Sequence, residues 1–120
     1  MTKTAREIEL LKTDIQAWLE SHELADDTGW RDVDMQYGDR PKNFKHPHYL
    51  VLWFEGALHN VLWPLPDHPD HAWQCERREE LEALVNRHGC WFDFEDYCTL
   101  CIMDKDARTA AKDIAHEARL

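Results

Sequence analysis

The stretch Tyr49–Pro64, YLVLWFEGALHNVLWP, is the most apolar run of the chain and decides the fold that we expect. Tyr49–Phe54 is continuously apolar, which predicts a strand. Glu55-Gly56 places a glycine where a tight turn needs one. Ala57–Trp63 then reads as the return strand, and Pro64 ends it. The stretch therefore predicts a β-hairpin at the centre of a sheet.

The first strand of this hairpin is apolar on both of its faces. Successive side chains of a strand point to opposite sides, and both alternating sets of Tyr49–Phe54 are large and apolar. Such a strand needs cover on both faces. We expect helices to cover one face, and a curled sheet edge or a partner protein to cover the other.

The residues before the hairpin predict one helix and one strand. Apolar side chains recur at helical spacing over residues 4–24, so this segment is an amphipathic helix that ends near Ser21–His22. Asp26-Asp27-Thr28-Gly29 has the composition of a turn. Val33, Met35 and Tyr37 alternate with polar residues, which predicts a half-buried strand over 32–37.

The residues after the hairpin predict two helices and a second hairpin. Pro64–Trp73 is rich in proline and histidine and is expected to be a loop. The elements expected after it are a helix over 76–88 with Gly89 at its C-terminal cap, strands over 90–94 and 97–103 joined at Glu95-Asp96, and a helix over 104–118 that Asp104 caps.

The expected order of elements is thus α-β-β-β-α-β-β-α. This order predicts an α+β fold in which an antiparallel sheet of about five strands carries its helices mainly on one face. At 120 residues, the chain is expected to form a single domain over 1–120.

The composition favours some classes of partner over others. The 24 acidic residues outnumber the 14 lysines and arginines, which gives a net charge of -10. Such a surface repels phosphate backbones, so we expect no direct binding of nucleic acid. It attracts a basic protein, although solubility alone also explains it. The start of the chain resembles no signal peptide and no apolar run is long enough for a membrane, so we expect a cytoplasmic protein with reduced cysteines.

Cysteines and histidines are numerous enough to raise the question of a metal. His88, Cys90, Cys98 and Cys101 supply four soft ligands. However, Cys98 and Cys101 are three apart in a predicted strand, so their side chains face opposite sides and buried core thiols are the preferred interpretation. Proline separates His68 from His71 and His46 from His48, which favours solvated loops over a helical metal site. We therefore expect no metal and no cofactor.

The sequence contains no motif that is typical of catalysis. It lacks a nucleophile elbow, a phosphate-binding glycine loop and a dinucleotide fingerprint, and only four glycines are present in total. No nucleophile–base pair can be nominated from spacing. The sequence therefore favours a protein that is not an enzyme.

Acidic and aromatic residues alternate in several predicted turns and loops. They are typical of a protein interface, because aromatic side chains anchor a partner and carboxylates attract a basic one. The alternative is that the rings belong to the core and the acids protect sheet edges. The residues that we nominate for binding a partner are Asp26, Asp27, Trp30, Trp73, Asp93, Glu95 and Asp96.

The central segment LVLWFEGALHNVLW, the Ala17-Trp18-Leu19 of the first helix and the Arg78-Glu79-Glu80-Leu81 of the later helix together resemble bacterial immunity proteins. These are the antidotes of polymorphic, interbacterial or contact-dependent toxins. The resemblance is one of pattern, spans residues 8–90, and carries no family residue onto this chain. It implies a non-enzymatic inhibitor that binds a cognate toxin and occludes its active site.

The sequence therefore supports three hypotheses. The first is an immunity protein that neutralises a basic toxin through an acidic, aromatic surface. The second is a small metal or redox protein that uses His88, Cys90, Cys98 and Cys101. The third is a structural subunit of a larger assembly that docks through the hairpin of Tyr49–Trp63.

Overall fold

The computed structural model describes residues 3–31 and 48–104, which form three helices and four strands in an α+β fold. The strand expected over 32–37 lies outside the described residues, as does the helix expected over 104–118 except for Asp104. The elements are α1 (Ala5–Ser21), β1 (Thr28–Arg31), β2 (His48–Phe54), α3 (Ala57–Leu62), α4 (His71–Arg87), β3 (Cys90–Asp96) and β4 (Thr99–Asp104).

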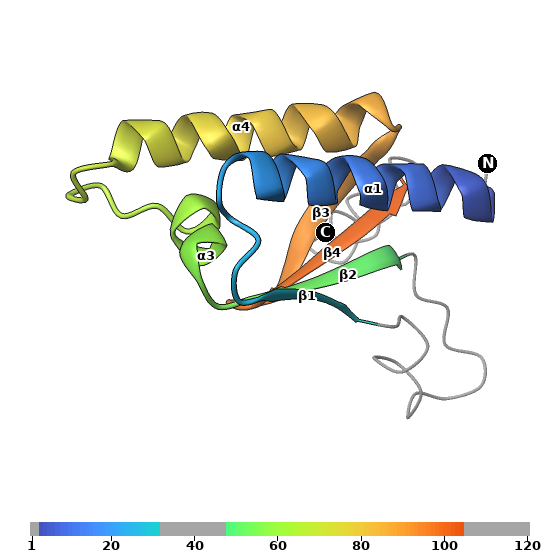
Figure 1. Ribbon diagram of the computed structural model, residues 1–120, viewed down its shortest axis with the longest axis horizontal. Coiled ribbons are helices and arrows are strands. Elements are labelled where there is room, and N and C mark those ends of the chain that lie inside the picture. Colours follow the sequence, from blue (N-terminus) through green and yellow to red (C-terminus); the bar gives the residue numbers. More distant parts are fainter. Residues whose placement is uncertain (1–2, 32–47, 105–120) are drawn as a thin grey trace, which may run out of the picture.

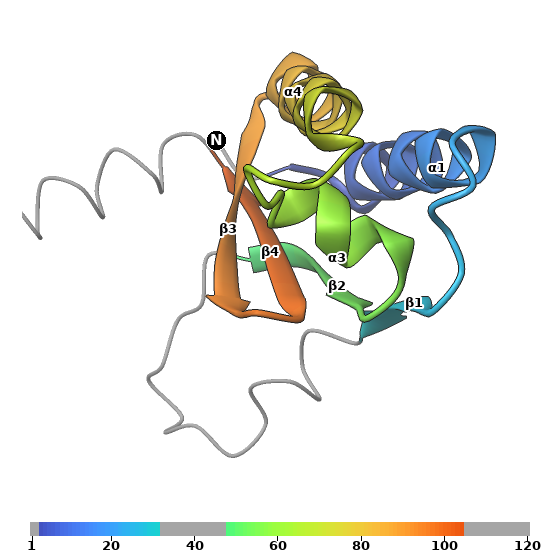
Figure 2. The same cartoon turned by 90° about the vertical axis from the view of Figure 1, so that its left-hand side faces the viewer.

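The four strands form one antiparallel sheet in the order β1-β2-β4-β3. β2 and β4 therefore lie in the centre, and β1 and β3 form the edges. All three helices lie over the same face of the sheet (Figures 1 and 2), which agrees with the expected arrangement. The expected second hairpin is also present as β3–β4, but its turn is Tyr97-Cys98 rather than Glu95-Asp96.

Helix α1 begins and ends where local chemistry favours a helix boundary. Thr4 forms a capping box with Glu7: the Thr4 hydroxyl accepts a bond from the Glu7 N–H, and the Glu7 carboxylate accepts one from the Thr4 N–H. The apolar stripe of α1 is buried against the sheet and α4 through Leu11, Ile15, Trp18 and Leu19. The helix predicted from periodicity is confirmed, and it ends at Ser21.

The return strand predicted over Ala57–Trp63 is wrong, because this segment forms helix α3. Leu58, Val61 and Leu62 are buried together, and spacings of three and four residues bring side chains together on a helix but not on a strand. β2 pairs instead with β1 and β4, so the central hairpin that we expected does not exist. The sheet therefore has four strands within the described residues, rather than about five.

Gly56, which we expected in a hairpin turn, is the N-cap of α3. A Cβ atom at this position would lie 2.7 Å from the backbone oxygen of Asp26. The glycine thus allows the α1–β1 turn to pass directly against the start of α3. Close approach of two backbones, and not the dihedral angles of a hairpin turn, explains this glycine.

The strand β2 is buried on both faces, as its sequence predicted. Leu50, Leu52 and Phe54 pack into the larger core cluster between the sheet and the helices. Val51 points to the opposite face, where it is fully buried with Cys101 and Met103. The continuous apolar run is thus explained by a central strand whose two sets of side chains enter two separate clusters.

Helix α4 begins at His71, five residues before the helix expected over 76–88, so the preceding loop ends at Asp70. It lies antiparallel to α1, since His22 contacts Glu80 at 3.5 Å while Asp14 contacts His88 at 2.7 Å. Within residues 3–31 and 48–104, no helix has the length and apolar character needed to cross a membrane.

Candidate functional site

A groove runs between α4 and the edge strand β3 and continues past the end of α3. Its first part has a volume of about 360 Å³ and is lined by Trp63, Arg78, Glu82, Asn86 and the four consecutive residues Trp91, Phe92, Asp93 and Phe94. Its second part, of about 550 Å³, is lined by His59, Asn60, Trp63, Pro64, Leu65, Arg78 and Tyr97. Because Trp63 and Arg78 line both parts, we treat them as one site, the aromatic groove.

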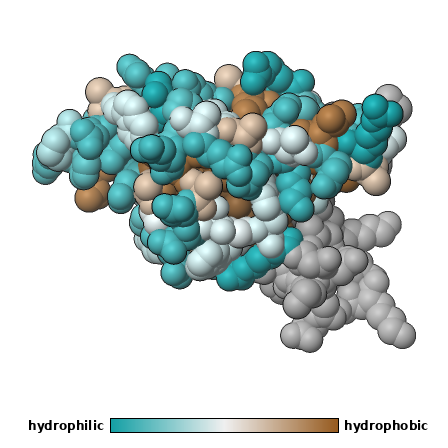
Figure 3. Space-filling model, viewed as in Figure 1, coloured by the Kyte–Doolittle hydropathy of each residue, from teal (hydrophilic) through white to brown (hydrophobic). Residues whose placement is uncertain are grey.

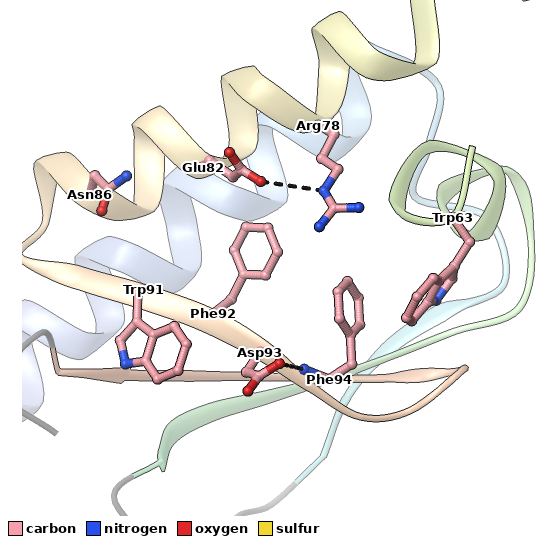
Figure 4. A pocket seen from close by; sticks show the side chains of 8 residues that line it. All are labelled: Trp63, Arg78, Glu82, Asn86, Trp91, Phe92, Asp93 and Phe94. Carbon is pink, nitrogen blue, oxygen red and sulfur yellow. Dashed lines mark hydrogen bonds and ion pairs between the residues drawn. The ribbon is translucent and has the colours of Figure 1, made fainter. Parts of the chain in front are cut away.

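The α4 wall of the groove is made by side chains one helical turn apart. Arg78, Glu82 and Asn86 follow one another at intervals of four residues, so they share a face of α4. Figure 4 shows Arg78 and Glu82 extending from α4 toward the Phe92 and Phe94 rings that rise from β3. A helix face and a strand therefore supply opposite walls.

Arg78 is held in place by contacts with three different elements. Its Nη1 donates a 2.9 Å hydrogen bond to the backbone oxygen of Leu62, and its Nε lies 3.3 Å from Glu82 Oε1. Its guanidinium carbon lies 5.7 Å from the centre of the Phe94 ring, a cation–π distance. An arginine fixed in this way loses little side-chain entropy when a partner contacts it.

A cluster of aromatic rings forms the part of the groove that lies past the end of α3. The Trp63 ring lies 4.4 Å from Phe94 and 5.3 Å from Tyr97, and the Trp63 Nε1 donates to the backbone oxygen of Tyr97 at 3.0 Å. Tyr97 and Leu65 are nevertheless 73% and 65% exposed. Large apolar side chains that are exposed side by side are typical of surfaces that bind proteins.

Exposed carboxylates from three separate segments meet at one end of the sheet. Glu55 donates its backbone N–H to Asp27 O at 2.9 Å, and the neighbouring Phe54 donates to Cys98 O at 2.9 Å. Thr99 in turn pairs with Asp96. These contacts join the start of β1, the end of β2 and the β3–β4 turn. We call the exposed acids gathered there the acidic end: Asp26, Asp27, Glu55, Glu95 and Asp96.

The nominated residues thus fall into three groups. Asp26, Asp27, Glu95 and Asp96 belong to the acidic end, and Asp93 lines the groove beside it. The two nominated tryptophans lie elsewhere. Trp30 packs between β1 and α1, where its Nε1 donates to Gln16 Oε1 at 3.0 Å, and Trp73 lies in the first turn of α4 under Arg77.

The cysteines and histidines considered as metal ligands do not converge. Cys90 lies in the core beneath the helices, Cys101 lies in the cluster on the opposite face of the sheet, and Cys98 lies in the turn at the far end of the β3–β4 hairpin. All four cysteines are free thiols. In the part of the chain that the structure describes, no three His, Cys, Asp or Glu residues are arranged to hold a metal ion.

Of the two histidines expected in the proline loop, His68 lies in the loop, but His71 does not. His71 is the first residue of α4, and its Nε2 lies 3.5 Å from Cys75 Sγ. His68 accepts the backbone N–H of Asp70 at its Nδ1, at 3.0 Å. Both side chains therefore have contacts that organise the start of α4.

Sequence reasoning missed the residues that build the groove, namely Trp63, Arg78 and Tyr97. Trp63 was assigned to the return strand that does not exist, and Tyr97 was placed in a strand rather than in the turn. The Arg78–Glu82 spacing was visible in the sequence, but nothing in the sequence indicated that this face of α4 lies against β3.

A further hollow of about 320 Å³ lies between α1 and Trp30 of β1, and polar side chains line most of it, namely Glu9, Lys12, Thr13, Gln16 and Glu20. Figure 3 shows that the face seen in Figure 1 is mostly hydrophilic, with smaller hydrophobic areas among the hydrophilic residues. Tyr49 lies at the opposite end of β2 from the acidic end. Burial raises the pKa of Tyr49, and its hydroxyl donates a 3.0 Å hydrogen bond to Asp104 Oδ2.

Comparison with known proteins gave no match to a family model, to a curated protein or to a solved structure. The groove and the acidic end are therefore the features from which a function can be proposed.

Proposed function

We propose that this protein is a non-enzymatic inhibitor that binds a basic partner protein through the acidic end and the aromatic groove, as an immunity protein binds its toxin. The observation that carries the proposal is the position of the acidic end beside the groove. Tyr97 follows Asp96 directly and lines the groove, and Asp93 lines it from β3.

The two features have complementary roles in binding. Carboxylates at the rim attract a basic surface over long range and accelerate its association. The exposed ring of Tyr97, which packs against the half-buried ring of Trp63, supplies apolar area without a large entropy cost. The fixed Arg78 adds hydrogen-bond donors at the centre of the site.

The charge distribution adds support. Like charges near one another destabilise a fold unless something compensates for them. Here the acids come from three segments that are distant in the sequence, so the fold itself concentrates them. A basic partner provides that compensation in the complex.

The test is capture of partners on the tagged full-length protein, followed by measurement of affinity and neutralisation. One variant combines Asp26→Asn, Asp27→Asn and Asp96→Asn. Its control combines Glu9→Gln, Glu20→Gln and Glu79→Gln, which remove the same charge from exposed positions on α1 and α4. We expect a basic partner whose toxicity is neutralised by the protein, and whose affinity falls about tenfold or more in the first variant only.

An acidic partner, or a partner whose activity the protein leaves unchanged, would contradict the proposal. Equal affinity of the two variants would show that the acidic end has no part in binding.

A further inference from the structure

The outer edge of β3 has backbone groups that the sheet does not use. β3 is an edge strand, and within residues 3–31 and 48–104 only β4 pairs with it. In an antiparallel ladder, the N–H and C=O of alternate residues point to the same neighbour. The register of β2, β4 and β3 therefore determines which groups of β3 point outward.

Phe54 N–H donates a hydrogen bond to Cys98 O. In this register, the backbone N–H and C=O groups of the even-numbered residues of β4 point toward β2. The odd-numbered residues Cys101 and Met103 must then bond with Asp93 and Trp91 of β3. The N–H and C=O groups of Phe92 and Phe94 consequently point away from the sheet. This direction agrees with the position of Asp93 Oδ1, which accepts the Phe94 N–H at 2.8 Å.

The Asp93 carboxylate thus occupies an edge donor that a further strand would otherwise bind (Figure 4). Charged side chains at sheet edges discourage unwanted pairing. When a strand does pair there, it takes over the Phe94 N–H and releases the Asp93 carboxylate, which is then able to bind a cation.

We propose that the β3 edge binds an extended segment of the partner protein as a fifth strand, in which apolar side chains alternate with lysine or arginine. The proposal rests on the proposed function and specifies how the partner binds. Addition of a strand to an exposed sheet edge is a common mode of peptide recognition, in which main-chain bonds supply affinity and side-chain pockets supply specificity.

The two faces of the added strand determine its sequence. Side chains on one face lie toward α4 and meet Phe92, Phe94 and the apolar part of the groove. Side chains on the other face lie beside Asp93 and Glu95, which are exposed. The first set therefore has to be apolar and the second set basic.

A second copy of this chain fits the same edge less well. Antiparallel pairing of two β3 strands would bring the Asp93 and Glu95 carboxylates of both copies together, and opposed like charges destabilise a strand pair. The net charge of -10 on each copy adds to this repulsion.

The test uses a random decapeptide library displayed on phage and selected on the immobilised full-length protein. We expect enrichment of sequences that alternate apolar residues with lysine or arginine. An enriched peptide is then synthesised in two forms, each N-methylated on one of the two alternate sets of residues. Because a strand bonds to its neighbour through one set only, we expect one form to lose about tenfold or more in affinity and the other to bind unchanged.

Amide hydrogen exchange and two variants complete the test. The unmethylated peptide should protect the Phe92 and Phe94 amides from exchange. Asp93→Asn keeps an acceptor for the Phe94 N–H but removes the charge, so it should weaken binding of the basic peptide, whereas the control Glu9→Gln on α1 should not.

Enriched basic peptides that bind equally in both methylated forms, or that protect no β3 amide, would overturn strand addition while leaving a basic partner in place. Absence of any basic peptide among the enriched sequences would contradict both the strand and the proposed function. Protection of Phe92 and Phe94 that grows with protein concentration alone would assign the edge to a second copy.

Discussion

At the scale of single residues, Gly56 determines how closely α3 approaches the turn before β1. An added Cβ would lie 2.7 Å from Asp26 O and 3.1 Å from the Asp27 Cβ, and backbone atoms cannot move away as a flexible side chain would. We expect Gly56→Ala to lower the free energy of unfolding by about 1–3 kcal/mol in urea titrations.

Gly29→Ala is the matched control for this substitution. Its Cβ would lie 3.5 Å from the edge of the Trp53 ring, an ordinary contact, so we expect a change within about 0.5 kcal/mol. Equal effects of the two substitutions would show that the contact with Asp26 is unimportant.

Glu7 is a residue whose ionisation contributes to stability. The Thr4 N–H donates a hydrogen bond to the Glu7 carboxylate, and the Thr4 hydroxyl lies beside that carboxylate. Both groups lower the pKa of Glu7 below the ordinary value of 4.5. A carboxyl group whose pKa is lower in the folded state stabilises the fold above its unfolded pKa and loses this contribution as the pH falls through its folded pKa.

We therefore expect the stability difference between the natural protein and Glu7→Gln to shrink as the pH falls below 4.5. Thermal unfolding at several pH values from neutral to acidic measures this difference. A difference that is constant over the whole range would contradict a role for the Glu7 charge in the capping box.

At the scale of elements, α3 explains why sequence patterns misassigned the centre of the fold. As a strand, Ala57–Trp63 would place Val61 and Leu62 on opposite faces, but as a helix it buries both with Leu58. A run of seven residues is too short for periodicity to separate the two possibilities, and the glycine before it fits either a turn or a helix start.

Substitutions on α3 distinguish the two structures in solution. Val61 is 1% exposed, so we expect Val61→Ala to cost about 1–3 kcal/mol of unfolding free energy. Asn60 is exposed on the helix, and we expect Asn60→Ala to change the stability by less than about 0.5 kcal/mol. A strand would instead place Asn60 on the same face as Leu58 and Leu62, and the two costs would become similar.

At the scale of the whole molecule, the antiparallel topology concentrates negative charge. It brings the ends of strands that are distant in the sequence to one end of the sheet, and each of those ends carries acidic residues. This concentration of like charges is expected to reduce the stability of the free protein.

The variant with Asp26→Asn, Asp27→Asn and Asp96→Asn tests this cost. Asparagine accepts the Cys98 N–H that Asp96 accepts, and it tolerates the positive φ of Asp27, so the main change is the lost repulsion. We expect a melting temperature higher by a few degrees at about 10 mM salt, and a difference that nearly vanishes at about 1 M salt. A salt-independent difference would point to a cause other than charge.

Much of the fold was predictable because its cause is local. The apolar stripe of α1, the glycine after α4 and the β3–β4 hairpin were each expected from a few neighbouring residues, whereas the capping box of α1 was not predicted. Asp26, Asp27, Asp93, Glu95 and Asp96 were also nominated from their local clustering, whereas Glu55 was not. By contrast, the pairing of β2 with β4 joins residues some fifty positions apart, as in Leu52↔Leu100, and no local pattern encodes it.

The groove depended on the same long-range contacts. Trp63, Arg78 and Tyr97 come from the end of α3, from α4 and from the β3–β4 turn, and only their packing makes them neighbours. The sequence by itself determined the mixed class of the fold, the two-sided burial of β2 and the excess of acidic surface, because these follow from composition and short periodicity. Only the tertiary structure decided that residues 57–62 are helical, that β3 forms an edge, and that the acids of three segments meet beside an aromatic groove. The reason is that these features arise from contacts between segments that are distant in the sequence.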